Sequence, residues 1–495
     1  MKTTITDNLS WNKIRNSVIQ TEEFLSTGGN LRLSTKEVFV DRILMKYKND
    51  ELNEGFNNLE KLAASMHFFK AKQLIDNSEV FKLLKLMPKG GLLHGHNAAM
   101  VSSEWIIKNL TYYPGLLKCT NKDGVVIFSF RKSDSHNCNT NYELVANERN
   151  RSNNPEFYDR ILEKSINLYV PRPEVEYPNI KVVWDKFQNI FLTVNDFIKF
   201  LPVFKAYHYR LLEEMYQDGI FYIEMRHTFS QGYDHKNSLS AIEMTLELLN
   251  VVKDFKRTHP DFIDLRAIYQ VKRRITIEEL SQQISQFLTL RSYFPEFIIG
   301  IDLVGQEDTG NSLYYYYKLL QQLSPTNRFF FHAGETNWYG VAADYNILDA
   351  ILLNTTRIGH GYALVKHPVL WNSVKRYGIA IEVSLISNQI LHLVEDLRNH
   401  PAAFYISENI PIVITNDDPG FWNAKGLSYD FYYCLMAVGS NRAGLKLLKQ
   451  LIINSLKYSA MTSNDKNIAI KIFHKRWNNF LDHIIKNYNL YNSKN

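Results

Sequence analysis

Eight short apolar runs, each followed by a stretch with helical spacing, constrain the fold of this chain more than any other feature. Strands of a parallel sheet are buried on both faces, so they read as continuous apolar segments. Eight strand–helix repeats predict an α/β protein with a (β/α)8 barrel. The predicted strands are residues 91–94, 220–224, 265–269, 298–303, 329–332, 356–360, 379–383 and 411–415.

Two regions depart from this repeat. Residues 1–85 have apolar residues at three- and four-residue spacing and no strand-like run, which predicts a helical region that forms either a dimerisation arm or a packing layer. Residues 111–183 are polar and irregular and too long for an ordinary loop, so we expect an inserted subdomain over the barrel mouth. The barrel itself then comprises residues 86–110 and 184–495.

Charge and hydropathy exclude several classes of function. The net charge is +6 over 495 residues, and no apolar run is long enough to span a bilayer. No zinc knuckle, basic-aromatic array or glycine-rich phosphate loop is evident, so we expect no nucleic-acid partner. The first sixteen residues lack the apolar core of a signal sequence, which fits a cytoplasmic protein or a mature secreted one.

The cysteines leave two interpretations open. Cys119, Cys138 and Cys434 are either three free thiols, or the first two form a disulfide and the third is buried. Four glycosylation sequons add weight to secretion but matter only in an exported protein; they begin at Asn8, Asn109, Asn150 and Asn354.

Polar residues follow the apolar runs directly, where barrel enzymes place their chemistry. His94-x-His96 puts two imidazoles on one face of a strand, but with 15 histidines chance alone gives roughly 0.45 such pairs. His332 ends another strand. Asp417 and Asp418 are adjacent carboxylates that either repel each other unless a cation is near, or cap a helix before Pro419.

These strand ends together predict a metal site. Three imidazoles and one carboxylate suit Zn²⁺ best, and the predicted ligands are His94, His96, His332 and Asp417. Glu335 can then act as a general acid in a closed pocket, unless it only caps the following helix. His360 can accept or orient a proton of water, and Asp418 can accept a hydrogen bond from the substrate or a shifted proton.

Several segments together resemble the adenosine deaminase superfamily: MPKGGLLHGHNAAM, FYIEMR, GIDLVGQED, FFFHAGETNW, TTRIGHGYAL, ISNQIL and TNDDP. Four more are similar to its secreted branch, the adenosine deaminase 2 or adenosine deaminase-related growth factor family: SMHFFKAKQLI, VVWDKFQNIF, DLRNHP and AKGLSYDF. The resemblance runs from about residue 25 to 485. It implies a barrel with one zinc ion that converts adenosine, and 2′-deoxyadenosine, to inosine-type products and ammonia.

The resemblance also implies roles for individual residues. It makes the four predicted metal ligands zinc ligands, Glu335 the proton donor to purine N1 and His360 the base for the attacking water. The implied substrate contacts are Asp418, Gly305, Trp184, Phe187, Phe191 and Asn97. It further implies a secreted homodimer that regulates extracellular adenosine, a Cys119–Cys138 disulfide, and a cell-surface receptor or polyanion as partner.

Three positions depart from the family pattern. Asn97 stands where aspartate is usual, Lys272 stands where a substrate-contacting histidine is expected, and Ser384-Leu385 replaces a Cys-Pro pair. The first two lie on the ribose side of the expected pocket. They keep two alternatives open: a catalytically weak growth factor-like binding protein, and a deaminase of another aminopurine.

Overall fold

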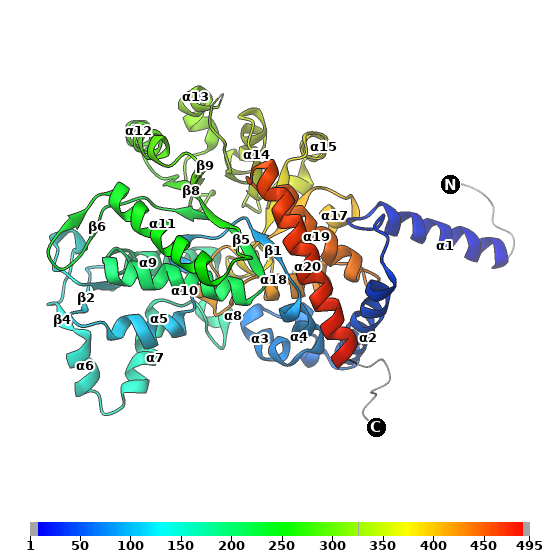
Figure 1. The fold of residues 1–495 in the computed structure, drawn as a ribbon, viewed down its shortest axis with the longest axis horizontal. Coiled ribbons are helices and arrows are strands. Elements are labelled where there is room, and N and C mark those ends of the chain that lie inside the picture. The colour runs from blue at the N-terminus through cyan, green and yellow to red at the C-terminus, as the bar shows by residue number, and fades with distance from the viewer. Residues whose placement is uncertain (1–7, 325, 489–495) are drawn as a thin grey trace.

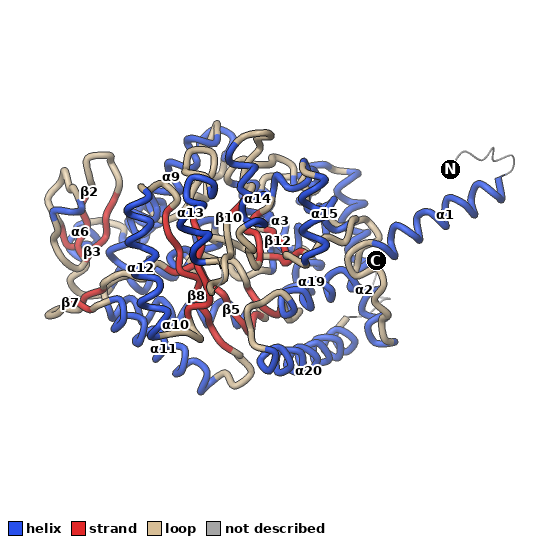
Figure 2. Tube along the Cα trace, turned by 90° about the horizontal axis from the view of Figure 1, so that it is seen from above, coloured by secondary structure: helices blue, strands red, loops and turns tan. Residues whose placement is uncertain are grey.

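The structure, a computed structural model, describes residues 8–324 and 326–488, and its centre is a closed barrel of eight parallel strands (Figures 1 and 2). The strands form two four-stranded sheets, in the orders β1-β5-β8-β9 and β10-β11-β12-β13. The predicted (β/α)8 fold is therefore confirmed. The barrel strands are β1 (Gly90–Leu92), β5 (Ile220–His227), β8 (Asp264–Lys272), β9 (Ile298–Val304), β10 (His332–Ala333), β11 (Arg357–His360), β12 (Ala380–Val383) and β13 (Ile412–Ile414).

Two seams join the sheets. At one, Ile301 donates a backbone hydrogen bond to Arg328 and accepts one from Phe330, both 3.1 Å long. At the other, the His96 amide donates to the Asp417 carbonyl (3.0 Å) and the Asp417 amide donates to the His94 carbonyl (3.3 Å). The second seam brings the first and last strands together at the predicted metal ligands.

Helices surround the barrel and cover its strands (Figure 2). Some begin with side-chain caps: in α11 (Ala241–Thr258), Ser240 and Glu243 form a reciprocal capping box that satisfies amides at the start of the helix. The helices that follow the insertion are α9 (Ile180–Ile198), α10 (Leu201–Gln217), α11 (Ala241–Thr258), α12 (Ile277–Tyr293), α13 (Leu313–Leu323), α14 (Ala342–Leu352), α15 (Pro368–Tyr377), α16 (Leu385–Ile390), α17 (Ala402–Ser407), α18 (Ser428–Tyr433), α19 (Leu445–Lys457) and α20 (Ser463–Asn487).

The N-terminal region is helical. It contains α1 (Asn8–Leu25), α2 (Thr35–Asn57), α3 (Phe68–Asn77) and α4 (Glu79–Leu86). Helices α2 and α4 pack on α20 and α18, whereas α1 projects from the body in both views (Figures 1 and 2). Across the described residues, no helix combines the length and apolarity needed to cross a membrane.

The long connection between β1 and β5 contains a small antiparallel sheet in the order β3-β2-β4. The elements of this connection that precede α9 are α5 (Ser103–Asn109), β2 (Leu117–Thr120), β3 (Val126–Ser129), β4 (Glu143–Leu144), α6 (Val145–Arg151), α7 (Pro155–Ser165) and α8 (Pro173–Glu176). A disulfide joins Cys119 to Cys138, and Cys434 is free and buried. Strand β3 packs against α9. A further hairpin, β6 (Gly232–Tyr233) and β7 (Ser238–Leu239), follows β5.

Candidate active site

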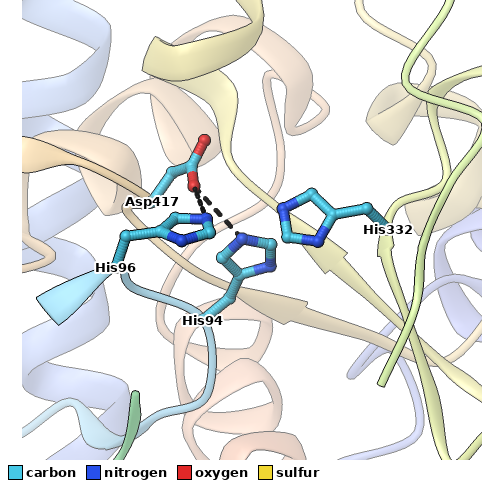
Figure 3. A group of neighbouring side chains, drawn as sticks. All are labelled: His94, His96, His332 and Asp417. Atoms are coloured by element: carbon cyan, nitrogen blue, oxygen red, sulfur yellow. Dashed lines mark ion pairs between the residues drawn. The ribbon is translucent and has the colours of Figure 1, made fainter. Parts of the chain in front are cut away.

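The four predicted metal ligands meet at the carboxyl ends of the barrel strands (Figure 3). One potential ligand atom from each of His94, His96, His332 and Asp417 lies within 4.8 Å of all the others, and all four residues are buried. They come from the chain just after β1, from β10 and from the chain just after β13. The structure therefore brings together residues that are up to 323 positions apart because the barrel closes.

Each imidazole is oriented by a hydrogen bond from its Nδ1 atom. His94 donates to Glu382 Oε2 (2.7 Å), His96 donates to Gln270 Oε1 (2.8 Å), and His332 donates to Asp302 Oδ2 (2.6 Å). Because the proton is held on Nδ1, Nε2 of each ring keeps a free lone pair, which faces the cluster and can bind a metal ion. Such oriented imidazoles are typical of metal sites in proteins.

Asp417 supplies the carboxylate of the cluster. Its backbone is in the left-handed region (φ 58°), and its Oδ2 accepts a hydrogen bond from Ser387 Oγ (2.7 Å). Its Oδ1 lies 3.1 Å from His94 Nε2 and 3.2 Å from His96 Nε2. Within the described part of the chain, His94 Nε2 and Asp417 Oδ1 are buried and have no hydrogen-bond partner. Buried polar atoms left in this state fit a bound cation.

A charged network lies beneath the cluster, inside the barrel. Glu382 accepts from Arg226 Nη2 and Arg357 Nε, both at 2.6 Å, in addition to His94. Arg226 also donates to Asp302, and Arg357 donates to Glu224. All five carboxylate and guanidinium groups are fully buried. Burial opposes the ionisation of Glu382, but Arg226 and Arg357 outweigh it and hold the pKa of Glu382 well below its usual value.

Glu335 lies beside the cluster in a position suited to hold a proton. Its backbone amide donates to Glu307 Oε1 (2.8 Å), which anchors the turn after β10. Burial raises the pKa of the Glu335 carboxyl well above its usual value, and the negative charges of Asp417 and Glu307 add to the shift. The surroundings of Glu335 therefore favour the protonated form of its carboxyl.

His360 and Asp418 complete the inner end of the site. His360 ends β11 with a left-handed backbone (φ 59°), and its Nε2 lies 3.7 Å from Glu335 Oε1 and 3.8 Å from Asp417 Oδ2. Burial lowers the pKa of His360 well below its usual value, so the ring is neutral. Burial, followed by the charge of Asp417, raises the pKa of Asp418 well above its usual value.

These groups open into a cavity of about 840 Å³. Trp184, Phe187 and Phe191 on α9 form one wall, with successive ring centroids 5.3 and 5.1 Å apart. Asn97, Gly305 and Lys272 also line the cavity. Among the predicted site residues, His94 lies beneath the cavity rather than on its surface; those on the surface are His96, Asn97, Trp184, Phe187, Phe191, Gly305, His332, Glu335, His360, Asp417 and Asp418.

The insertion contributes to the cavity only through its contact with α9. Among the described residues, those that line the cavity come from outside residues 111–183. The insertion instead packs through β3 on α9, and α9 supplies the aromatic wall. Ser384, one of the departures from the family pattern, is buried and is not part of the cavity lining. Its hydroxyl forms a hydrogen bond with the hydroxyl of Thr415 (2.7 Å).

Sequence reasoning missed the residues that hold the site in place. Of these residues, Gln270 lines the cavity and the others lie behind its wall. The residues are Glu224, Arg226, Gln270, Asp302, Glu307, Arg357, Glu382 and Ser387. A usable signal was present for several. Asp302 and Glu382 are single charged residues inside otherwise apolar strands, and Glu224 directly follows the apolar run of residues 220–223. A buried charge in such a strand requires a partner.

The fold and the cluster define the chain as a (β/α)8 barrel protein with a candidate metal centre at the carboxyl ends of its strands. Residues 2–84 match the family described as "Adenosine/AMP deaminase N-terminal", and residues 169–474 match "Adenosine deaminase". The chain is 40% identical to adenosine deaminase 2 of Homo sapiens over 480 residues, covering 96% of this chain and 94% of the human protein. It is 38% identical to an adenosine deaminase of Phlebotomus duboscqi, with 92% and 89% of the two chains covered.

The chain belongs to the adenosine deaminase family, in its adenosine deaminase 2 branch. Solved structures agree in fold. An Arabidopsis N6-mAMP deaminase superposes with a TM-score of 0.57 at 15% identity, covering 80% of this chain and 99% of the other. An adenine deaminase from Arthrobacter aurescens gives a TM-score of 0.53 at 17% identity, covering 78% and 98%.

Proposed function

We propose that this protein deaminates adenosine and 2′-deoxyadenosine by hydrolysis. In the net reaction, water adds its oxygen to C6 of the purine, N1 gains one proton, and the amino group leaves with the other as ammonia. One observation carries the proposal: the Glu335 carboxyl, whose pKa is raised by burial, lies beside a buried three-histidine, one-aspartate cluster at the inner end of an aromatic-walled cavity. Sequence similarity to proteins named adenosine deaminase supports adenosine as the substrate.

Each residue has a distinct role in this proposal. The Glu335 carboxyl donates its proton to N1 as C6 is attacked, and the aromatic rings on α9 pack against the substrate. Asp418 and Gly305 hydrogen-bond the purine, and Asn97 contacts the ribose side. His360 directs Nε2 toward the same space, where it meets the attacking water. Its assignment as the base stays a prediction.

The metal we propose is one Zn²⁺ per chain, held by His94, His96, His332 and Asp417. Three imidazoles and a carboxylate form a borderline donor set that suits zinc. When bound, the ion supplies Lewis-acid activation of water near neutral pH. The buried, unpartnered atoms of His94 and Asp417 support a cation at this position.

A chelation experiment tests function and metal together. The purified protein should convert adenosine to inosine, followed by the loss of adenosine absorbance. Removal of metal by a chelator should abolish turnover and lower the melting temperature, because a ligand that binds only the folded state stabilises it. Added Zn²⁺ should restore both. A zinc-loaded protein that turns over no purine would contradict the proposal and favour the growth factor-like alternative.

We also propose that the protein is secreted. The Cys119–Cys138 disulfide supports this, because such bonds persist in oxidising compartments. Three of the four sequon asparagines have side chains that the structure describes, and Asn109, Asn150 and Asn354 are all exposed. N-glycans at these positions on protein collected from culture medium would support export, and their absence from all three would weigh against it.

We further propose that the helical region 1–85 and the insertion 111–183 are units added to the barrel, and that α1 mediates a homodimer. Helix α1 projects from the body and exposes Trp11, Phe24 and Leu25 at 58%, 61% and 59% (Figure 1). Light scattering should give twice the chain mass for the native protein and the monomer mass for a Trp11→Ser, Phe24→Ser variant. A native monomer at micromolar concentration would overturn this. A receptor or polyanion remains a proposed partner.

A further inference from the structure

A chain of hydrogen bonds runs from the backbone through two buried side chains to His360, and neither side chain has a role in the proposed reaction so far. Asn388 and His400 belong to the segments ISNQIL and DLRNHP that mark the family resemblance. Asn388 lies on α16, His400 follows residues 397–399, and both are buried. The donor and acceptor in each of these hydrogen bonds can be assigned, because the series starts at a group that can only donate.

That group is the backbone amide of Ala402, which can only donate. It donates to His400 Nδ1 (3.0 Å), so the proton of the neutral His400 ring is on Nε2. Burial lowers the pKa of His400 to about 3, which keeps this ring neutral at physiological pH. His400 Nε2 lies 2.9 Å from Asn388 Oδ1 and therefore donates to it.

The amide of Asn388 is oriented by this bond. With Oδ1 engaged by His400, Nδ2 is directed toward His360 and lies 3.1 Å from its Nδ1. An amide NH2 group is a donor only, so His360 Nδ1 must accept and cannot carry a proton. The proton of the neutral His360 ring is then on Nε2, which faces Glu335 and Asp417. The three other histidines of the site have the opposite tautomer, because carboxylate or amide oxygens accept from their Nδ1 atoms.

We propose that Asn388 and His400 are positioning residues that hold His360 as an Nε2–H hydrogen-bond donor to the oxygen of the attacking water. This inference rests on the proposed function, but it replaces the base role predicted for His360 with that of a hydrogen-bond donor. A donor at this position fixes the direction of the water's lone pairs, whereas a base would need a free lone pair on Nε2. The two roles require opposite tautomers, and Asn388 decides between them.

The decisive variant is Asn388→Asp, studied at pH 9 so that the introduced carboxyl is ionised. A carboxylate accepts from both histidines and so moves the His360 proton to Nδ1. We expect kcat for adenosine to fall about 10- to 100-fold, the effect of losing one good hydrogen bond, with a smaller change in KM. Asn388→Ala is the matched control: it leaves the tautomer unspecified, and we expect an intermediate loss.

The tautomer is read directly, without turnover. Metal-free protein labelled with ¹⁵N-histidine should show a protonated Nε2 for His360 in the native chain and a protonated Nδ1 in Asn388→Asp, with the signal assigned by its loss in His360→Gln. A native His360 protonated on Nδ1 would overturn the inference, as would an Asn388→Asp variant that switches tautomer yet keeps the native kcat. Because the spectrum needs no substrate, a protein without deaminase activity would refute the proposed function and still leave this inference testable.

Discussion

Replacing Glu335 with glutamine is expected to lower kcat for adenosine about 10²- to 10⁴-fold, the range for removing a general acid. Glutamine has nearly the same shape but no carboxyl proton to give to N1. Burial is the main cause of the raised pKa of Glu335, so the acid form persists to higher pH than in an exposed glutamate. Native activity should therefore decline on the alkaline side, as pH rises through the raised pKa and Glu335 ionises. Steady-state kinetics across pH measures both effects.

The control for this variant is its metal content. Glu335 is outside the four-residue cluster, so Glu335→Gln should bind as much zinc as the native protein and unfold at a similar temperature. If the variant keeps kcat within tenfold of the native value, another group must protonate N1. Asp418, whose pKa is also raised, would then be the next candidate.

Glu382→Gln is expected to lower the free energy of unfolding by about 3–5 kcal/mol, as removal of one partner from a buried ion network does. Glu382 accepts three short hydrogen bonds from Arg226, Arg357 and His94. A glutamine offers one oxygen, and its NH2 group must then face other N–H donors. Urea unfolding of metal-free protein measures the loss separately from any change in zinc binding.

A surface carboxylate provides the comparison. Glu104 pairs with Lys108 at 2.8 Å, with both side chains more than half exposed, and Glu104→Gln should change stability by less than about 1 kcal/mol. Zinc affinity should fall about 10- to 100-fold in Glu382→Gln, because His94 loses the acceptor that orients it. Equal stability losses in the two variants would refute the structural importance of the buried network.

Much of the fold was predictable because parallel barrel strands have a local signal. Each strand is buried on both faces and is therefore a continuous apolar run, which a short window of sequence contains. The strand predicted at residues 329–332 shows the limit of this reasoning. Phe329 makes only an isolated bridge, and regular pairing begins at His332. Apolar content alone does not specify where backbone pairing starts.

The position of the insertion was harder to predict. Residues 111–183 have no periodicity that indicates which surface they cover, and the contact of β3 with α9 depends on side chains far apart in the chain. The pairing of Cys119 with Cys138 was likewise one of two open interpretations, and the structure shows the disulfide. Contacts between distant segments leave little trace in local composition.

The sequence by itself determined the barrel class and which residues have metal-binding and acid–base chemistry, since residue type and strand-end position are both local properties. Only the tertiary structure decided that His94, His96, His332 and Asp417 lie within one ion's reach, because that depends on closure between the first and last strands. It also decided the surroundings of the proton-carrying groups. The raised pKa of Glu335 and the contact of Asn388 Nδ2 with His360 Nδ1 depend on burial and on partners that are distant in the chain.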